Sequence, residues 1–360
     1  MGGEQPATMN GSEESESDRC HVLRSAATHG AWGRELVLRL LLGAIIGAVG
    51  GFVAYGFQTG AHPLDCDFHQ IWIGARALWR GESPYIAVRT VERFPLFYPA
   101  SALTLGLPFI TLSRQLACIA FSAAGTAVLA FALSAQPWRL IALLSVAYLH
   151  AVGLSQWSPL AVAAYYLPAA AALWAVKPQL GFPAVLAWPA HWRLQLLVGG
   201  MLVAVALVLY PAWPAEWIDA LHSSIQVPPL FRPGGILLLA TLLRWKRPEA
   251  RWMMGLAALP QTSLLYETFP LFVVPATRGE MTLLVALSWV ALIVKAYVPA
   301  RHGVAEGAAA HWPILLVCLW LPALAMLLRR PNVAQTSTEG VERRTCTWAG
   351  IIPRSCRAIQ

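Results

Sequence analysis

Residues 36–57, LVLRLLLGAIIGAVGGFVAYGF, contain one charged side chain, Arg39, in a stretch long enough to cross a bilayer as a single helix. A spanning helix needs about 20 mostly apolar residues, within a range of about 17–25. The stretch is longer than the apolar part of a signal peptide and lacks a convincing small-residue cleavage site, which predicts a retained anchor. Its glycines would let a neighbouring helix approach closely.

Apolar stretches recur from Leu36 to Leu328. The 360 residues are 57% apolar and 12% charged, with a mean hydropathy of +0.56, whereas a soluble domain is about 45–50% apolar and about 25% charged. This composition excludes a water-soluble enzyme and a disordered, collagen-like or disulfide-rich chain, and no basic block suggests nucleic-acid binding. The predicted fold class is all-α, a polytopic transmembrane bundle with about 9–11 crossings of the lipid bilayer.

Prolines recur at the ends of the apolar runs and predict broken or re-entrant helices in the middle of the chain. Irregular backbone at membrane depth persists only where protein or a watery cavity covers it. The middle of the chain is therefore expected to line a cavity. The prolines concerned are Pro99, Pro108, Pro159, Pro168, Pro178, Pro183 and Pro189.

The charges predict how the chain is organised around the membrane. Residues 1–33 form a predicted polar cytoplasmic tail, 34–330 the transmembrane domain, and 331–360 a second polar, disordered cytoplasmic tail. Arg24 and Arg34 precede the first span, so its start is expected in the cytoplasm and residues 58–97 form the first outside loop. Abundant Ala and Trp, with more Arg than Lys, favour a GC-rich bacterial source and hence the bacterial plasma membrane.

Residues 67–80 of this loop, DFHQIWIGARALWR, have the pattern of an amphipathic helix. Apolar side chains recur at intervals of three and four residues and form one face. Two tryptophans on that face suit a helix lying flat in the membrane interface. The apolar positions are Phe68, Ile71, Trp72, Ala75, Leu78 and Trp79.

Asp67 stands at the start of this helix, where two roles compete. It suits an N-cap, with Gln70 three residues later as in a capping box. It also suits a general base at the membrane surface, kept ionised by the helix N-terminus. Asp65 competes for either role, and His69 is expected to be a polar residue of the interface.

The cysteines show no metal-ligand or redox spacing. They are Cys20, Cys66, Cys118, Cys318, Cys346 and Cys356. Cys118 and Cys318 lie inside apolar runs and are expected to be buried thiols. Asp65 and Asp67 could hold a divalent ion, but two carboxylates are too few to assign a metal, and no cofactor is predicted.

Five motifs occur in one order between residues 65 and 276. They are Asp67-Phe68 with residues 75–78 and Pro84-Tyr85, then Tyr98-Pro99 with residues 107–109, Gln156 in LSQWSPL, Lys177-Pro178-Gln179, and Tyr266-Glu267. Together they resemble family 87 of the GT-C glycosyltransferases, polytopic enzymes that take sugar, typically mannose, from a polyprenyl-phosphate donor. Ser155 and Glu267 stand where Gly and Asp are usual, and only 20 residues separate Gln156 from Lys177, where the family commonly fits two crossings.

The resemblance implies a GT-C-type bundle that transfers a hexose, with inversion, from a polyprenyl-phosphate sugar to a lipid or glycan acceptor on the outer face. It implies that Asp67 is the catalytic base. Lys177 lies in a stretch without Asp or Glu between Glu92 and Glu216, and because an intramembrane cation is a functional candidate by default, it is assigned to the lipid phosphate. The other predicted substrate-binding residues are Asp65, His69, Arg76, Gln156, Gln179, Tyr266 and Glu267.

Each of these residues also has a structural alternative. Lys177 could snorkel to lipid headgroups, and Arg76 could contact them. Gln156 and Gln179 could join helices by hydrogen bonds, and Glu267 could pair with an arginine at a helix end.

A transporter or flippase is the competing function, because broken helices with a buried lysine also describe carriers. Carriers often show two matching halves, and none are visible here. A non-catalytic scaffold would have no need of the clustered Asp65 and Asp67.

Overall fold

The computed structural model describes residues 14–60, 66–92, 94–224, 226–262, 264–298 and 304–332. These residues form helices and no strand, apart from one isolated antiparallel bridge between Val227 and Gln261. The predicted all-α class is confirmed. Asp65 and the two chain ends, 1–13 and 333–360, lie outside the described residues, and so does most of the predicted C-terminal tail.

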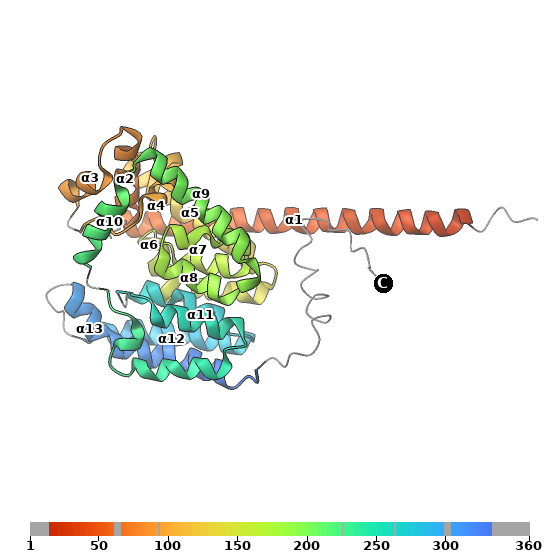
Figure 1. Cartoon of the computed structure of the whole chain (residues 1–360). Coiled ribbons are helices and arrows are strands. Elements are labelled where there is room, and N and C mark those ends of the chain that lie inside the picture. Colours follow the sequence, from red (N-terminus) through yellow and green to blue (C-terminus); the bar gives the residue numbers. More distant parts are fainter. Residues whose placement is uncertain are drawn as a thin grey trace, which may run out of the picture.

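Fourteen α-helices in the described part follow one another with short 3-10 and π segments between them (Figure 1). The α-helices are α1 (Glu14–Thr59), α2 (Phe68–Trp79), α3 (Pro84–Val91), α4 (Ala100–Gly106), α5 (Arg114–Leu133), α6 (Val146–Gly153), α7 (Ser158–Tyr166), α8 (Pro178–Ala187), α9 (Trp192–Leu209), α10 (Trp213–His222), α11 (Pro248–Ala258), α12 (Arg278–Ala296), α13 (Val304–Leu315) and α14 (Leu321–Leu328). The other segments are η1 (Leu107–Phe109), η2 (Pro137–Leu144), η3 (Pro168–Ala175), η4 (Pro189–His191), η5 (Pro229–Phe231), η6 (Gly235–Arg244), η7 (Leu265–Val273) and the π-helical η8 (Leu316–Trp320).

Five helical segments are long and apolar enough to cross a membrane, which indicates a membrane protein. They are Gly33–Thr59, Arg114–Leu133, Pro189–Leu209, Arg278–Ala296 and Ala309–Leu328. This is fewer than the 9–11 predicted crossings, because prolines divide the remaining apolar sequence into helices of about ten residues or fewer. Four of the segments between residues 137 and 187 have a proline in the first turn, where its missing N–H costs nothing.

Helix α1 packs along α5 through its glycines, as the sequence predicts. A Cβ at Gly47 would lie 2.7 Å from the Ala127 Cβ and 2.8 Å from the Ala123 carbonyl oxygen. Arg39 fixes the register of the pair, because its guanidinium donates to the Ser134 Oγ at 3.0 Å and to the Phe131 carbonyl at 3.1 Å. Helix α5 also packs against α2.

A valine at Gly47 should separate these two helices. Overpacking of this kind costs about 1–3 kcal/mol, and the Ala123 carbonyl is backbone that cannot move aside. We expect Gly47→Val to lower the midpoint of unfolding, followed by tryptophan fluorescence in detergent. Gly56→Val is the matched control on the same helix, since a Cβ there meets nothing within 4 Å; equal midpoints for the two variants would contradict this packing.

The predicted amphipathic helix at 67–80 is α2, but protein rather than lipid covers most of its apolar face. Phe68, Ile71 and Ala75 are buried against α4 and α5, and the Phe68 ring stacks on Phe121 with 4.1 Å between centroids. Trp79 alone of the two tryptophans stays largely exposed, while the Trp72 indole N–H donates to the Phe109 carbonyl at 3.2 Å.

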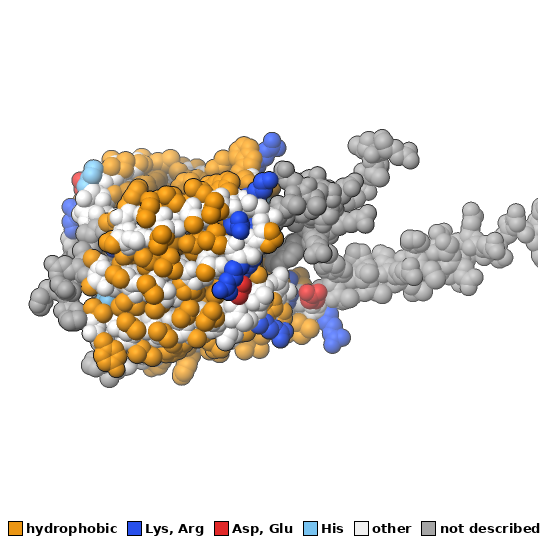
Figure 2. Space-filling model, turned by 90° about the horizontal axis from the view of Figure 1, so that it is seen from below, with side chains coloured by type: hydrophobic (Ala, Val, Ile, Leu, Met, Phe, Trp, Pro, Cys, Tyr) orange, Lys and Arg blue, Asp and Glu red, His pale blue; other side chains and the backbone are white. Residues whose placement is uncertain are grey.

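The exterior of the body is largely apolar, and its charges lie near the ends. Figure 2 shows hydrophobic side chains over most of the visible face, with most of the visible Lys and Arg on the side from which α1 projects. Helices α2, α3 and α10 lie at the opposite end of the body (Figure 1). Helices α2 and α3, which belong to residues 58–97, thus lie across the body from the basic end.

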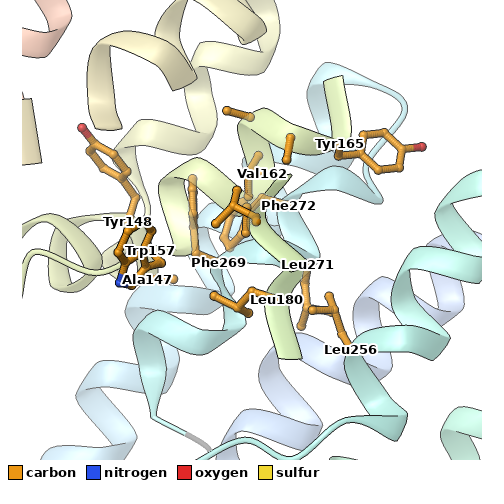
Figure 3. Close-up of a cluster of buried hydrophobic side chains, with 14 of the residues drawn as sticks. Ala147, Tyr148, Trp157, Val162, Tyr165, Leu180, Leu256, Phe269, Leu271 and Phe272 are labelled. Carbon is orange, nitrogen blue, oxygen red and sulfur yellow. The ribbon is translucent and has the colours of Figure 1, made fainter. Parts of the chain in front are cut away.

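A buried aromatic cluster holds the broken middle together (Figure 3). Tyr148 of α6 lies 5.5 Å from Phe269 of η7, centroid to centroid, and Leu180 of α8 and Leu256 of α11 belong to the same core. Every residue of η7 is buried. This segment therefore carries its one charged residue, Glu267, into the interior of the protein.

Candidate active site

Asp67, Gln156 and Lys177 form one hydrogen-bonded chain. The Gln156 Nε2 donates to the Asp67 Oδ2, and the Lys177 Nζ donates to the Gln156 Oε1 at 3.3 Å. The three residues come from three segments that are far apart in the sequence, and each lies in a different predicted motif. The structure thus joins a carboxylate and a cation through one neutral amide.

Asp67 immediately precedes α2, and its backbone N–H donates to the Leu154 carbonyl at 3.0 Å. Its side chain makes no cap hydrogen bond to the helix, so the capping alternative is wrong. The reason is that the Asp67 carboxylate turns to Gln156. Asp67 is half-buried, while Gln156 and Lys177 are buried, so Asp67 is the most accessible residue of the three.

Lys177 occupies the sharp bend between η3 and α8. Its backbone N–H donates to the Leu173 carbonyl at 2.8 Å, and its side chain is only 6% exposed. This burial contradicts the alternative of a lysine snorkelling to lipid headgroups. The ammonium lies 5.4 Å from the centre of the Tyr98 ring and is stabilised by the charges of Glu267 and Asp67.

Glu267 supplies a second carboxylate, which is buried and whose charge acts on Lys177. It is 4% exposed, and its Oε2 accepts the Leu264 backbone N–H at 3.4 Å. Its charge acts on Lys177 and on its neighbour Tyr266, whose side chain is also buried. A buried carboxylate is costly unless opposite charge compensates it, and Lys177 provides that charge.

Two residues of the site were missed by the sequence interpretation. Tyr98 resembles a residue of the interfacial aromatic belt in sequence, but its ring lies against Lys177. Arg232 lies in a proline-rich loop without helical periodicity and gave no signal. Its guanidinium interacts electrostatically with Glu267 and donates a hydrogen bond to the Gln261 carbonyl at 3.2 Å.

Four predicted site residues are not placed in this chain of contacts. His69 is buried and its Nδ1 contacts the Glu92 carboxylate, so the expectation of an interfacial polar residue is wrong. Arg76 is exposed, with its guanidinium 4.5 Å from the centre of the Trp72 ring. Gln179 is half-buried in the first turn of α8, and Asp65 lies outside the described residues.

A disulfide between Cys66 and Cys118 ties the start of α2 to α5. The expectation of a buried thiol at Cys118 is therefore wrong, and Cys318 is a free thiol as expected but is half-buried rather than buried. No sequence pattern indicated the pairing, because the two cysteines are 52 residues apart and lie in segments of different character. The bond holds the residue that directly precedes Asp67.

The described residues contain no group of three or more His, Cys, Asp and Glu side chains that could hold a metal ion. They do contain the half-buried Asp67, whose carboxylate accepts a hydrogen bond from Gln156, and the buried Lys177, which donates to the same Gln156. Such a carboxylate can take a proton from a hydroxyl group, and such a cation can stabilise an anion.

No protein-family model, curated protein or solved structure matches the chain.

Proposed function

We propose that the protein is a membrane glycosyltransferase. It transfers a hexose, with mannose as the expected sugar, from a polyprenyl-phosphate donor to a lipid or glycan acceptor. The observation that carries the proposal is the contact between Asp67, Gln156 and Lys177. Three motifs singled out for a base, an amide and a phosphate-binding cation meet at one place in the fold.

The chemistry needs one base and one cation. Asp67 removes the proton of the acceptor hydroxyl as its oxygen attacks the anomeric carbon of the donor sugar. The bond between that carbon and the phosphate oxygen breaks, its electron pair stays on the phosphate, and the configuration at the anomeric carbon inverts. Phosphate is a good leaving group and needs no acid, so positive charge from Lys177 suffices to stabilise it.

Scarcity of charge supports this assignment of roles. The sequence has no Asp or Glu between Glu92 and Glu216, and Lys177 is buried in the middle of that stretch. A buried cation is costly unless charge compensates it. Asp67 and Glu267 supply this compensation in the structure, and a phosphate would add to it in the complex.

Two features support a site on the outer face of the plasma membrane. Disulfides persist in oxidising compartments, and the Cys66–Cys118 bond lies next to Asp67. Most of the visible Lys and Arg side chains lie at the other end of the body (Figure 2), and cytoplasmic loops carry the excess of positive charge.

Membranes containing the protein should distinguish the proposal from transport. We expect labelled polyprenyl-phosphate hexoses, incubated with such membranes and their extracted lipids and glycans, to yield a labelled product. A nucleotide-activated hexose, added after depletion of polyprenyl phosphate, should yield none. Movement of labelled lipid across vesicles without any product would instead favour a flippase and contradict the proposal.

A further inference from the structure

Helix α5 holds both partners of the Asp67–Gln156 contact. Asp67 follows Cys66, which is bonded to Cys118 in the first turns of α5. Gln156 follows Ser155, whose Oγ donates to the backbone carbonyl of the same Cys118 at 3.1 Å. One helix position therefore anchors the carboxylate on one side and the amide on the other.

Ser155 has an unusual backbone conformation. Its φ is +52°, and it is the one residue other than glycine with positive φ in the described part of the chain. Side chains other than glycine are disfavoured there, because Cβ approaches the carbonyl oxygen too closely. The conformation must therefore be held by its surroundings.

Hydrogen bonds of the Ser155 side chain provide that hold. Ser155 is 1% exposed. The Ser122 Oγ of α5 lies 2.9 Å from the Ser155 Oγ and 2.9 Å from the Val152 carbonyl oxygen, and its single proton serves one of them at a time. The turn also has backbone support, since the Gln156 N–H donates to the Ala151 carbonyl at 2.7 Å.

We infer that Ser155 is a positioning residue, which with the Cys66–Cys118 disulfide sets Gln156 against the Asp67 carboxylate. Ser155 acts through Gln156 and touches no substrate. The inference rests on the proposed function only where activity is measured. Its structural content is that the Gln156 amide remains hydrogen-bonded to Asp67 because α5 holds both segments.

A loosened Ser155 turn should change the acidity of Asp67. A hydrogen bond to the charged form of a carboxylate favours that form, so loss of the Gln156 bond should raise the pKa of Asp67. Lys177, Tyr98 and Tyr266 also act electrostatically on Asp67, and Glu267 acts on Lys177. His69, two residues after Asp67, contacts Glu92. None of these groups changes in the variants below.

The test compares three serine variants of the full chain. Ser155→Ala keeps Cβ and loses the hydrogen bonds of the side chain, and Ser155→Gly loses both. Ser158→Ala is the control, because the buried Ser158 Oγ has no hydrogen-bond partner among the described residues.

We expect Ser155→Ala to lower kcat/KM by about 10- to 100-fold, the cost typical of a slightly misplaced group. The acid limb of its pH profile should move to higher pH. Ser155→Gly should recover part of the activity, because glycine adopts positive φ readily although it also loses the bond to α5, and Ser158→Ala should match the wild type.

Infrared titration of the Asp67 carboxyl gives a readout that needs no enzymatic activity. The C=O band is assigned by its loss in Asp67→Asn, and its pH midpoint should rise in Ser155→Ala and in the Cys66→Ala/Cys118→Ala double variant. Unchanged midpoints in both would overturn the inference, and so would a Ser155→Gly variant as impaired as Ser155→Ala. Absence of transfer by the wild type, with the midpoint shifts present, would refute the proposed function and leave the positioning role standing.

Discussion

Replacing Asp67 by Asn should lower kcat for hexosyl transfer by about 10²- to 10⁴-fold, the contribution of a general base. The substitution is nearly isosteric, so it removes the proton acceptor with little change of shape. Gln156 already donates to Asp67, and the asparagine carbonyl oxygen can accept the same bond. The variant should therefore fold and retain the donor lipid, measured by co-purification of labelled polyprenyl phosphate.

Glu82→Gln is the matched control for this variant. Glu82 lies in the same outside loop and pairs with Arg80 at the surface, where both side chains are 54% exposed. A surface pair of this kind contributes little, so transfer should remain at the wild-type rate. If Asp67→Asn also retained the wild-type rate, Asp67 would not be the base.

Replacing Lys177 by Met should produce the second large effect. Loss of one group that stabilises developing charge typically costs about 10²–10³ in rate, and the phosphate would lose its one assigned cation. The Lys177 ammonium also compensates Asp67 and Glu267, so both the KM for the donor and kcat should deteriorate. Steady-state kinetics with a polyprenyl-phosphate hexose measure both constants.

Two further lysine variants sharpen this prediction. Lys177→Arg retains the charge and should recover part of the donor affinity, although its planar head does not match the contact with Gln156. Lys295→Met is the control, because Lys295 is also partly buried but lies in the last turn of α12. A Lys177→Met variant that is no more impaired than Lys295→Met would remove Lys177 from the site.

Much of the site could be predicted because polar residues are rare in this chain. Gln156 and Lys177 stand in apolar runs, and buried polar groups must find partners. That Asp67 joins them was indicated by the order of the motifs in the resemblance, because residue type alone favoured a helix cap for Asp67 equally well. The helix at 67–80 and the close α1–α5 packing follow in the same way from periodicity and glycine spacing.

The remaining features depend on contacts that no local pattern encodes. Cys66 and Cys118 have no diagnostic spacing and meet only because α5 packs against the start of α2. His69 is buried, and it contacts Glu92, the residue that directly follows α3 and is 23 positions further along the chain. Tyr98 has the sequence pattern of an interfacial aromatic residue, and only the fold brings the Lys177 ammonium against its ring.

The most direct measurement uses the purified full-length protein in liposomes that contain a labelled polyprenyl-phosphate hexose and acceptor lipids from a GC-rich bacterium. Wild-type protein should convert the donor into a labelled acceptor, releasing one polyprenyl phosphate for each hexose transferred, and Asp67→Asn should form almost no product. Release of polyprenyl phosphate without labelled product, or equal product from both proteins, would contradict the proposal that this chain is a transferase with Asp67 as its base.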